Sequence, residues 1–358
     1  MARRVCIVTG GGDAPGINAV LRAFVHASSP DIDVFGARFG FEGLMDDETI
    51  VPLPIAAVRG ILPKGGSILG CSTRVYPFFV PVPGGSATHD LGPDIVARLQ
   101  RLEMEGLVLI GGDGTMAAAK RFMDAGLPCV GIPKTIDNDM GGTDQTFGFD
   151  TALDTATRAV DALHSTAESH RRVMILEVMG RYAGFIALES GVAGGADVVL
   201  LPEIPYDIAR IVEKIEERER LGLRFTIVVV AEGAAPKGGV VAEIEGGRPG
   251  HLPRLGGAGA RLALESERAC PSAEVRVTVL GHLQRGGSPS AFDRALGSRF
   301  GAAAARLVRT GEWGKMVSLR GTRIESIPIE AALLEKKVLD PQGEYATAAR
   351  LLGITLGD

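Results

Sequence analysis

Two carboxylates close the stretch Pro133-Lys134-Thr135-Ile136-Asp137-Asn138-Asp139, which continues the apolar run that begins at Cys129. In an extended segment, residues i and i+2 point the same way, so Asp137 and Asp139 can face one site. One carboxylate can then orient the other for a proton transfer to or from a substrate. An Asx-rich turn without chemistry is the alternative interpretation of these residues.

Two glycine loops are candidates for phosphate binding. Gly10-Gly11-Gly12-Asp13-Ala14-Pro15-Gly16-Ile17-Asn18 follows one apolar run and precedes a helical segment, so backbone N–H groups and a helix N-terminus can receive a phosphate. The loop matches neither GxGxxG nor GxxxxGK[ST], and a glycine turn without a ligand remains open. Gly111-Gly112-Asp113-Gly114-Thr115 repeats the design with a carboxylate. Because Mg²⁺ typically takes one or two carboxylates and leaves its other positions to water and phosphate, the pair of loops favours a nucleoside polyphosphate.

The second half of the chain supplies positive charge. Arg172 follows Ser169-His170-Arg171, Arg181 ends the tripeptide Met179-Gly180-Arg181, and Arg276 precedes Gly281-His282-Leu283-Gln284-Arg285-Gly286-Gly287. Arginine presents a planar fork that suits bidentate contacts with phosphate. Each arginine taken singly also fits a surface or structural role. Together with the histidine among glycines, they make a second phosphate-bearing ligand plausible.

These residues need a scaffold, and the apolar runs that precede them supply one. Continuous apolar runs are typical of parallel strands covered on both faces, and helical segments between them fit βαβ units. The predicted strands are Val5 to Thr9, Gly106 to Ile110, Cys129 to Ile132, Val173 to Val178, Phe225 to Ala231 and Glu274 to Leu280. The predicted helices include Leu91 to Leu102, Asp207 to Leu221 and Ala291 to Val308. Most of the singled-out polar residues follow a strand, where doubly wound sheets bind ligands.

Composition limits the classes of protein that fit. A chain of 358 residues exceeds the size of about 250 to 300 residues at which single cores stop growing, so two lobes are expected. The net charge of -5 and the absence of a basic stripe argue against nucleic acid as a partner. Four scattered cysteines make no CxxC pair, and no signal-peptide core or membrane-spanning run occurs, so a cytoplasmic location is expected. The Gly- and Pro-rich stretch 233–259 is expected to be a loop or hairpin insertion.

The motifs together resemble the phosphofructokinase family, from Val5 to about Arg309. They are GGDAPGIN, GGDGT, PKTIDND, MGRYAG and LGHLQRGGSP, in this order. The resemblance implies two Rossmann-like, three-layer α/β lobes with mostly parallel sheets and an active site in the cleft between them. A donor-binding lobe would comprise 1–148 and 285–334, and a sugar-binding lobe 149–284 and 335–358. The implied reaction transfers the terminal phosphoryl group of a donor to the 1-hydroxyl of fructose 6-phosphate, giving fructose 1,6-bisphosphate.

The resemblance also implies a role for each motif residue. Asp137 would be the general base, with Thr135 and Asp139 orienting the reacting groups and Asp113 holding Mg²⁺. Arg74, in Gly70-Cys71-Ser72-Thr73-Arg74, would neutralise charge on the transferred group, and Arg181 would lie near it. The other donor contacts would be Gly11, Gly114 and Thr115. Sugar binding would fall to Met179, Gly180, Arg181, Glu232, His282 and Arg285. Arg172 and Arg276 would reach the 6-phosphate from a neighbouring subunit, which requires a homodimer or homotetramer.

The phosphoryl donor depends on two positions. Glycine at 114 leaves room for the α-phosphate of ATP, whereas the aspartate of pyrophosphate-dependent members crowds and repels it. Lysine at 134 is commoner in the pyrophosphate-dependent enzymes. Because a flexible lysine can be accommodated beside ATP, Gly114 is expected to decide, which favours ATP and leaves pyrophosphate as the alternative.

Regulation is expected to differ from the familiar bacterial pattern. Its effector-phosphate positions here are His26, His164, Leu221, Leu223 and Phe225, with only Arg22 retained. We therefore expect weak or absent control by ADP and phosphoenolpyruvate. A non-catalytic nucleotide or sugar-phosphate sensor is a remote alternative, because it would be expected to lose a group such as Asp137, Asp113 or Arg74.

Overall fold

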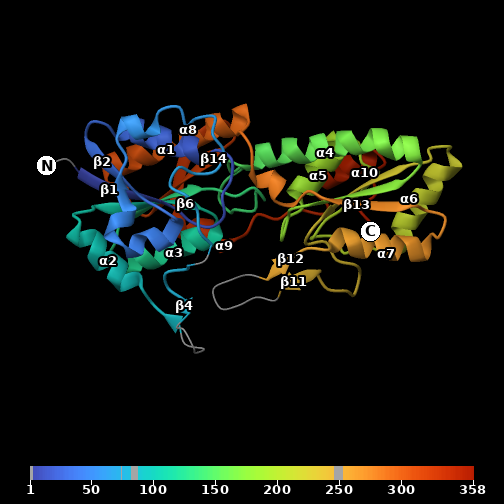
Figure 1. Ribbon diagram of the computed structural model, residues 1–358, viewed down its shortest axis with the longest axis horizontal. Coiled ribbons are helices and arrows are strands. Elements are labelled where there is room, and N and C mark those ends of the chain that lie inside the picture. The colour runs from blue at the N-terminus through green and yellow to red at the C-terminus, as the bar shows by residue number, and fades with distance from the viewer. Residues whose placement is uncertain (1–2, 74, 82–87, 246–252) are drawn as a thin grey trace. The chain divides into compact units, whose positions relative to one another are not determined.

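The computed structural model describes residues 3–73, 75–81, 88–245 and 253–358 (Figure 1). The chain divides into two compact units. The first comprises Met1–Ile136, Met140–Thr151 and Arg285–Lys337, and the second comprises Asp137–Asp139, Ala152–Gln284 and Val338–Asp358.

A seven-stranded sheet in the order β15-β14-β7-β6-β1-β2-β3 forms the centre of the first unit. Its strands are β1 (Arg3–Thr9), β2 (Ile32–Ala37), β3 (Ile50–Pro52), β6 (Gly106–Gly111), β7 (Cys129–Pro133), β14 (Lys315–Arg320) and β15 (Arg323–Pro328). The five inner strands run parallel, whereas β3 and β15 pair antiparallel at the two edges. The three strands predicted in this unit are confirmed, and the glycine loops follow two of them, β1 and β6.

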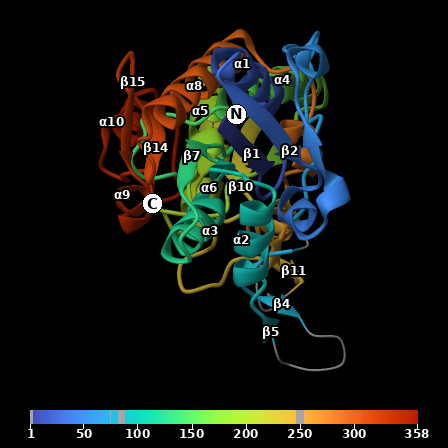
Figure 2. The ribbon, with the colours of Figure 1, turned by 90° about the vertical axis from the view of Figure 1, so that its left-hand side faces the viewer.

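Helices cover both faces of this sheet, because the inner strands are apolar on both sides. On one face lie α1 (Ile17–Ser28) and α8 (Ala291–Thr310), and on the other lie α2 (Gly92–Arg101), α3 (Asp113–Asp124) and α9 (Ile329–Leu334) (Figures 1 and 2). Val108, Ile110 and Val130 pack toward the first pair, and Leu107, Leu109 and Cys129 toward the second group. Within the unit this gives three layers.

The second unit has a four-stranded, all-parallel sheet in the order β13-β8-β10-β9. Its strands are β8 (Val173–Val178), β9 (Val198–Leu200), β10 (Thr226–Ala231) and β13 (Val275–Val279). Its helices are α4 (Phe149–His170), α5 (Phe185–Ala193) and α10 (Glu344–Leu351) on one face, and α6 (Ile208–Arg220) and α7 (Ala258–Ala269) on the other (Figure 1). The predicted strands and the amphipathic helix after Asp207 are confirmed, as is the mixed α/β class with mostly parallel sheets.

Short elements complete the described chain. In the stretch 233–259, β11 (Glu243–Glu245) pairs antiparallel with β12 (Arg254–Leu255). Of the loop and the hairpin that were expected there, the structure has the hairpin. A second antiparallel pair joins β4 (Val80–Pro81) and β5 (Thr88–His89), and the 3-10 turns are η1 (Gly40–Met45), η2 (Asp47–Thr49), η3 (Ile55–Val58) and η4 (Gly281–Arg285). Among the described residues, none of the helices has the length and apolar character needed to cross a bilayer.

Candidate active site

The first glycine loop, Gly10 to Asp13, connects β1 to the segment before α1. Gly10 donates from its backbone N–H to the Ile110 carbonyl at 2.8 Å, which ties the loop to the neighbouring strand β6. Gly11 and Gly16 have φ values of 71° and 105°, a region that glycine adopts without strain. The first turn of α1, all of it described, carries no acidic residue. The loop and helix N-terminus can therefore accept an anion.

Two cations contact the carbonyl groups of this loop. The Lys134 ammonium donates to the carbonyls of Gly10, at 3.0 Å, and of Gly12. The Arg285 guanidinium donates through Nη1 to the carbonyl of Asp13 at 3.0 Å. Lys134 is only 4% exposed, and this burial lowers its pKa to about 8. The structure thus brings Arg285, predicted as a sugar contact, to the first glycine loop.

The second glycine loop lies between β6 and α3, with Asp113 as the first residue of that helix. The Thr115 side chain is buried and packs where a β-carbon at Gly10 or Gly111 would stand, so both positions require glycine. At Gly114, by contrast, no described atom other than its chain neighbours and the backbone of its own helix lies within 4 Å of the place a β-carbon would occupy. The Asp113 carboxylate is partly exposed and lies 3.7 Å from the Lys336 ammonium.

The segment that carries the paired aspartates is bent rather than extended. Residues 136–137 form a bend, and Asn138 has a φ of 54°, so the extended geometry expected for Asp137 and Asp139 is wrong. Burial nevertheless alternates: Ile136 and Asn138 are buried, whereas Thr135, Asp137 and Asp139 are half-buried. The Thr135 carbonyl accepts from Thr146 Oγ1 at 2.7 Å, which anchors the start of the segment. Arg74, the arginine predicted to neutralise charge on the transferred group, lies outside the described residues.

The predicted sugar-binding residues of the second unit gather at one edge of its sheet. Because β8, β10 and β13 are parallel, their carboxyl ends share that edge. Met179, Gly180 and Arg181 follow β8, Glu232 follows β10, and His282 follows β13. Backbone hydrogen bonds link the first two segments: Glu232 donates to Val178 at 2.9 Å and Gly233 donates to Gly180 at 3.1 Å.

Gln284 is a positioning residue that sequence reasoning missed. It is fully buried, accepts from the Met179 backbone N–H at 3.2 Å and donates to the Gly281 carbonyl at 3.0 Å. It therefore connects the end of β8 to the turn that carries His282. The sequence signal was a polar residue inside an otherwise glycine-rich turn, but burial was needed to distinguish it from a surface glutamine.

Arg172 and Arg276 lie at the opposite edge of this sheet. Arg172 precedes β8, Arg276 is the second residue of β13, and both pair with Glu274, at 2.7 and 2.5 Å. A strand of six residues such as β8 spans roughly 20 Å. Within one chain, therefore, Arg172 and Arg276 lie far from the predicted sugar contacts that follow β8, β10 and β13.

None of the effector positions in the second unit is itself a lysine or an arginine, although the Arg218 guanidinium lies 5.3 Å from the centre of the Phe225 ring. His164 Nε2 lies 2.7 Å from the Gly194 carbonyl, and its ring packs edge-on against Phe225. Leu221 and Leu223 are exposed. The expectation of weak effector control stays a prediction.

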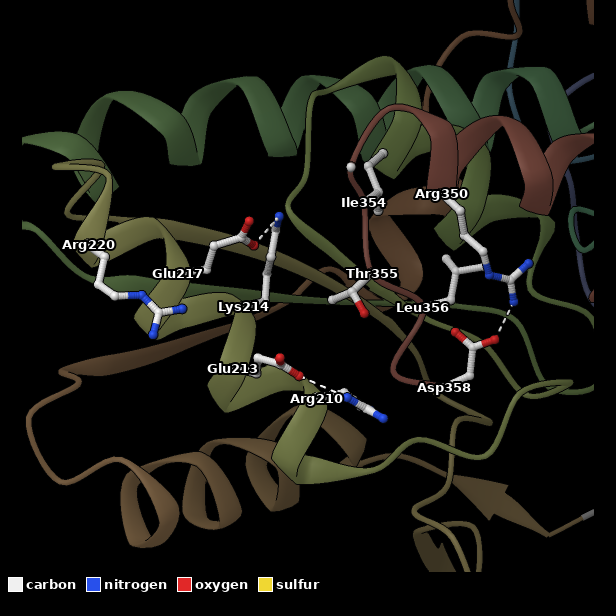
Figure 3. A pocket seen from close by; sticks show the side chains of 11 residues that line it. Arg210, Glu213, Lys214, Glu217, Arg220, Arg350, Ile354, Thr355, Leu356 and Asp358 are labelled. Carbon is white, nitrogen blue, oxygen red and sulfur yellow. Dashed lines mark hydrogen bonds and ion pairs between the residues drawn. The ribbon is translucent and has the colours of Figure 1, made fainter.

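A hollow of about 470 Å³ between α6 and the chain's last residues is a different feature (Figure 3). Its charged side chains are largely paired with one another: Arg210 with Glu213, Lys214 with Glu217, and Arg350 with Asp358. Its lining contains none of the residues predicted to act in phosphoryl transfer.

Comparison with known proteins agrees with the motifs. The chain matches the Phosphofructokinase family over residues 4–308. It is 46% identical to ATP-dependent 6-phosphofructokinase 2 of Clostridium perfringens, over 99% of both chains. It is also 49% identical to a pyrophosphate–fructose 6-phosphate 1-phosphotransferase of Streptomyces coelicolor, over 94% of this chain and 96% of that protein.

A solved structure gives the same result for the fold. The crystal structure of Pichia pastoris phosphofructokinase in the T-state superposes with a TM-score of 0.78 at 28% identity. The match covers 93% of this chain and 38% of the much longer Pichia chain. With full-length relatives above 40% identity and a family match over most of its residues, the chain belongs to the phosphofructokinase family.

Proposed function

We propose that this protein is an ATP-dependent 6-phosphofructokinase, which transfers the terminal phosphoryl group of ATP to the 1-hydroxyl of fructose 6-phosphate in glycolysis. The relatives named above divide between ATP and pyrophosphate as donor, so the names alone leave the donor open. The observation that carries the proposal is the open space beside Gly114, in the second glycine loop at the start of α3. An aspartate there would add a negative charge where the α-phosphate of ATP must lie.

The proposed donor-side roles fall mainly to the first unit. Asp113 would hold Mg²⁺, and its partly exposed carboxylate at the start of a helix fits an ion that needs few protein ligands. The bound ion would supply charge neutralisation for the donor phosphates. The loop amides near Gly11 and the space at Gly114 would receive these phosphates, and Arg74 would stabilise charge on the transferred group.

The sugar-side roles fall to the second unit. Asp137 would accept the proton of the sugar 1-hydroxyl, while Thr135 and Asp139 orient the reacting groups. The sugar contacts would be Met179, Gly180, Arg181, Glu232 and His282, with Arg285 as a further contact. Phosphoryl transfer asks the protein mainly for positioning and electrostatic stabilisation, and one carboxylate base completes that set without a covalent nucleophile.

The remaining assignments concern assembly and location. Arg172 and Arg276 would bind the sugar 6-phosphate of a neighbouring subunit in a homodimer or homotetramer, because they lie at the wrong edge of the sheet to serve their own chain. The cysteines of the described chain, Cys6, Cys71, Cys129 and Cys270, are free thiols, which fits the reducing conditions of the cytoplasm.

The deciding experiment supplies purified protein with fructose 6-phosphate, Mg²⁺ and either ATP or pyrophosphate as sole donor. We expect fructose 1,6-bisphosphate with ATP and little with pyrophosphate. The reverse preference would establish the pyrophosphate-dependent alternative, which Lys134 and the Streptomyces coelicolor relative favour. Binding of both ligands without product would support a sensor instead.

A further inference from the structure

The Lys134 side chain is hydrogen-bonded to the backbone of the first glycine loop. Its ammonium is buried and donates to two carbonyls of that loop, those of Gly10 and Gly12. A β-carbon at Gly11 would stand 3.7 Å from its nitrogen, so the ammonium lies against the middle of the loop. An ammonium has three donors, and two of them are used here.

Arg285 continues the same pattern one residue further along. Its Nη1 donates to the Asp13 carbonyl and would lie 3.4 Å from a β-carbon at Gly12. Two cations that are far from the loop in sequence therefore contact three carbonyls within four consecutive residues. A desolvated cation is costly unless its donors are satisfied, and these carbonyls satisfy them.

The planarity of the peptide bond gives this arrangement a consequence. In a trans peptide, the carbonyl of one residue and the N–H of the next point in opposite directions. When the carbonyls of Gly10, Gly12 and Asp13 face the two cations, the N–H groups of Gly11, Asp13 and Ala14 face away from them. The N–H groups of Asp13 and Ala14 are successive, and successive N–H groups directed to one side make an anion-binding concavity.

We infer that Lys134 and Arg285 are positioning residues that hold three peptide planes of the loop so that its N–H groups face the donor phosphates. The inference rests on the proposed function, since it concerns the donor of that reaction. It assigns Lys134 a role that is the same for ATP and for pyrophosphate, because both present phosphates to the same amides. Lys134 then does not select the donor.

The test is Lys134→Met, assayed for the kcat and for the KM of each substrate, with pyrophosphate as a competitive inhibitor against ATP. Because Lys134→Met removes both hydrogen bonds to the loop carbonyls, the KM for ATP should rise about tenfold or more, which corresponds to about 1.4 kcal/mol. The inhibition constant of pyrophosphate should rise in parallel, while the KM for fructose 6-phosphate changes little. A shift of the ATP and pyrophosphate constants in opposite directions, or an unchanged KM for ATP, would overturn the inference.

Lys120→Met is the matched control, because Lys120 lies on α3 in the same unit and pairs with Asp124 at the surface. It should keep the wild-type KM for ATP. If Lys134→Met fails to fold, Lys134→Gln retains an amide donor and should raise the KM for ATP by a smaller factor. A wild-type protein without kinase activity would count against the proposed function, whereas an active wild type with unaffected Lys134 variants would count against this inference alone.

Discussion

Gly114 is the residue at which the choice of donor can be tested most directly. We expect Gly114→Asp to raise the KM for ATP about a hundredfold, because a carboxylate about 5 Å from a phosphate charge costs about 3 kcal/mol at an effective dielectric constant of about 20. The backbone tolerates the change, since the site is open and Gly114 is not among the glycines with positive φ. Steady-state kinetics with varied ATP measures the effect.

Gly114→Ala is the control for this substitution. An added methyl group meets no described atom within 4 Å, so ATP turnover should stay close to that of the wild type. Undiminished ATP use by Gly114→Asp would contradict the steric and electrostatic argument for ATP.

Lys134 should give the protein a measurable dependence of stability on pH. Burial, with a smaller contribution from Arg285, lowers the pKa of Lys134 to about 8 from its ordinary value of 10.5, whereas nearby Cys71 and Asp13 oppose the shift. Between these two values the unfolded chain binds a proton that the folded chain lacks, so this residue makes the free energy of unfolding rise with pH, by on the order of 3 kcal/mol. We expect the Tm of Lys134→Met, relative to wild type, to fall from about pH 7.5 to about pH 9.5. Lys120→Met should show a constant difference over the same range.

At this scale, sequence reasoning identified residue types better than their contacts. The Lys134 side chain, which the sequence describes only as flexible, is buried against backbone carbonyls. The extended geometry assumed for Asp137 and Asp139 is replaced by a bend and a left-handed Asn138. Both differences depend on long-range packing, which the order of residues does not reveal.

At the scale of elements, the sequence predicts the strands that are largely apolar runs and misses β2, β14 and the antiparallel edge strands of the first sheet. Gly106 to Ile110 is a continuous apolar run, and Val173 to Val178 is interrupted only by the buried Glu177, because parallel strands covered on both faces have no polar side. The edge strand Arg323–Pro328 is antiparallel and mixed in character, with two charged side chains in six residues, so it carries no such signal. The candidate site residues follow β1, β6, β7, β8, β10 and β13, which were all predicted, so the gross placement of the candidate site was predictable.

Asp293 shows how helices are fixed around the first glycine loop. It lies in the first turn of α8, is fully buried, and accepts from the backbone N–H groups of Gly148 and Thr151, both at 2.8 Å, at the start of α4. Asp293→Ala leaves these N–H groups buried without that acceptor, which should cost about 2 kcal/mol or more. A lowered Tm in thermal unfolding measures this.

Asp154→Ala is the comparison for Asp293→Ala. Asp154 also lies on α4 but is exposed and pairs only with Arg158 one turn away, an interaction worth a few tenths of a kcal/mol. Equal losses of stability in the two variants would contradict the capping role of Asp293.

At the scale of the whole molecule, the second unit carries the residues proposed to bind the sugar phosphate at both edges of one sheet. Met179, Glu232 and His282 belong to the carboxyl edge, whereas Arg172 and Arg276 belong to the amino edge. One chain cannot use both sets on a single sugar phosphate when a strand of about 20 Å separates them. A closed homo-oligomer can, because symmetry presents the amino-edge arginines of one chain to the site of another.

Complementation between inactive variants tests this arrangement. Asp137→Asn should lose the base, and Arg172→Ala should lose a 6-phosphate contact, so each homo-oligomer should have low activity. In mixed oligomers, a site with Asp137 from one chain and Arg172 from the other is intact, so about half of the sites of a doubly purified dimer, or somewhat more than about a quarter of those of a tetramer, should be active. Co-expression of two differently tagged chains and assay of the doubly purified protein measures the recovery. Mixing Asp137→Asn with His282→Ala should recover nothing, because both residues would serve their own chain. Equally low activity in the two mixtures would mean that Arg172 does not act across subunits.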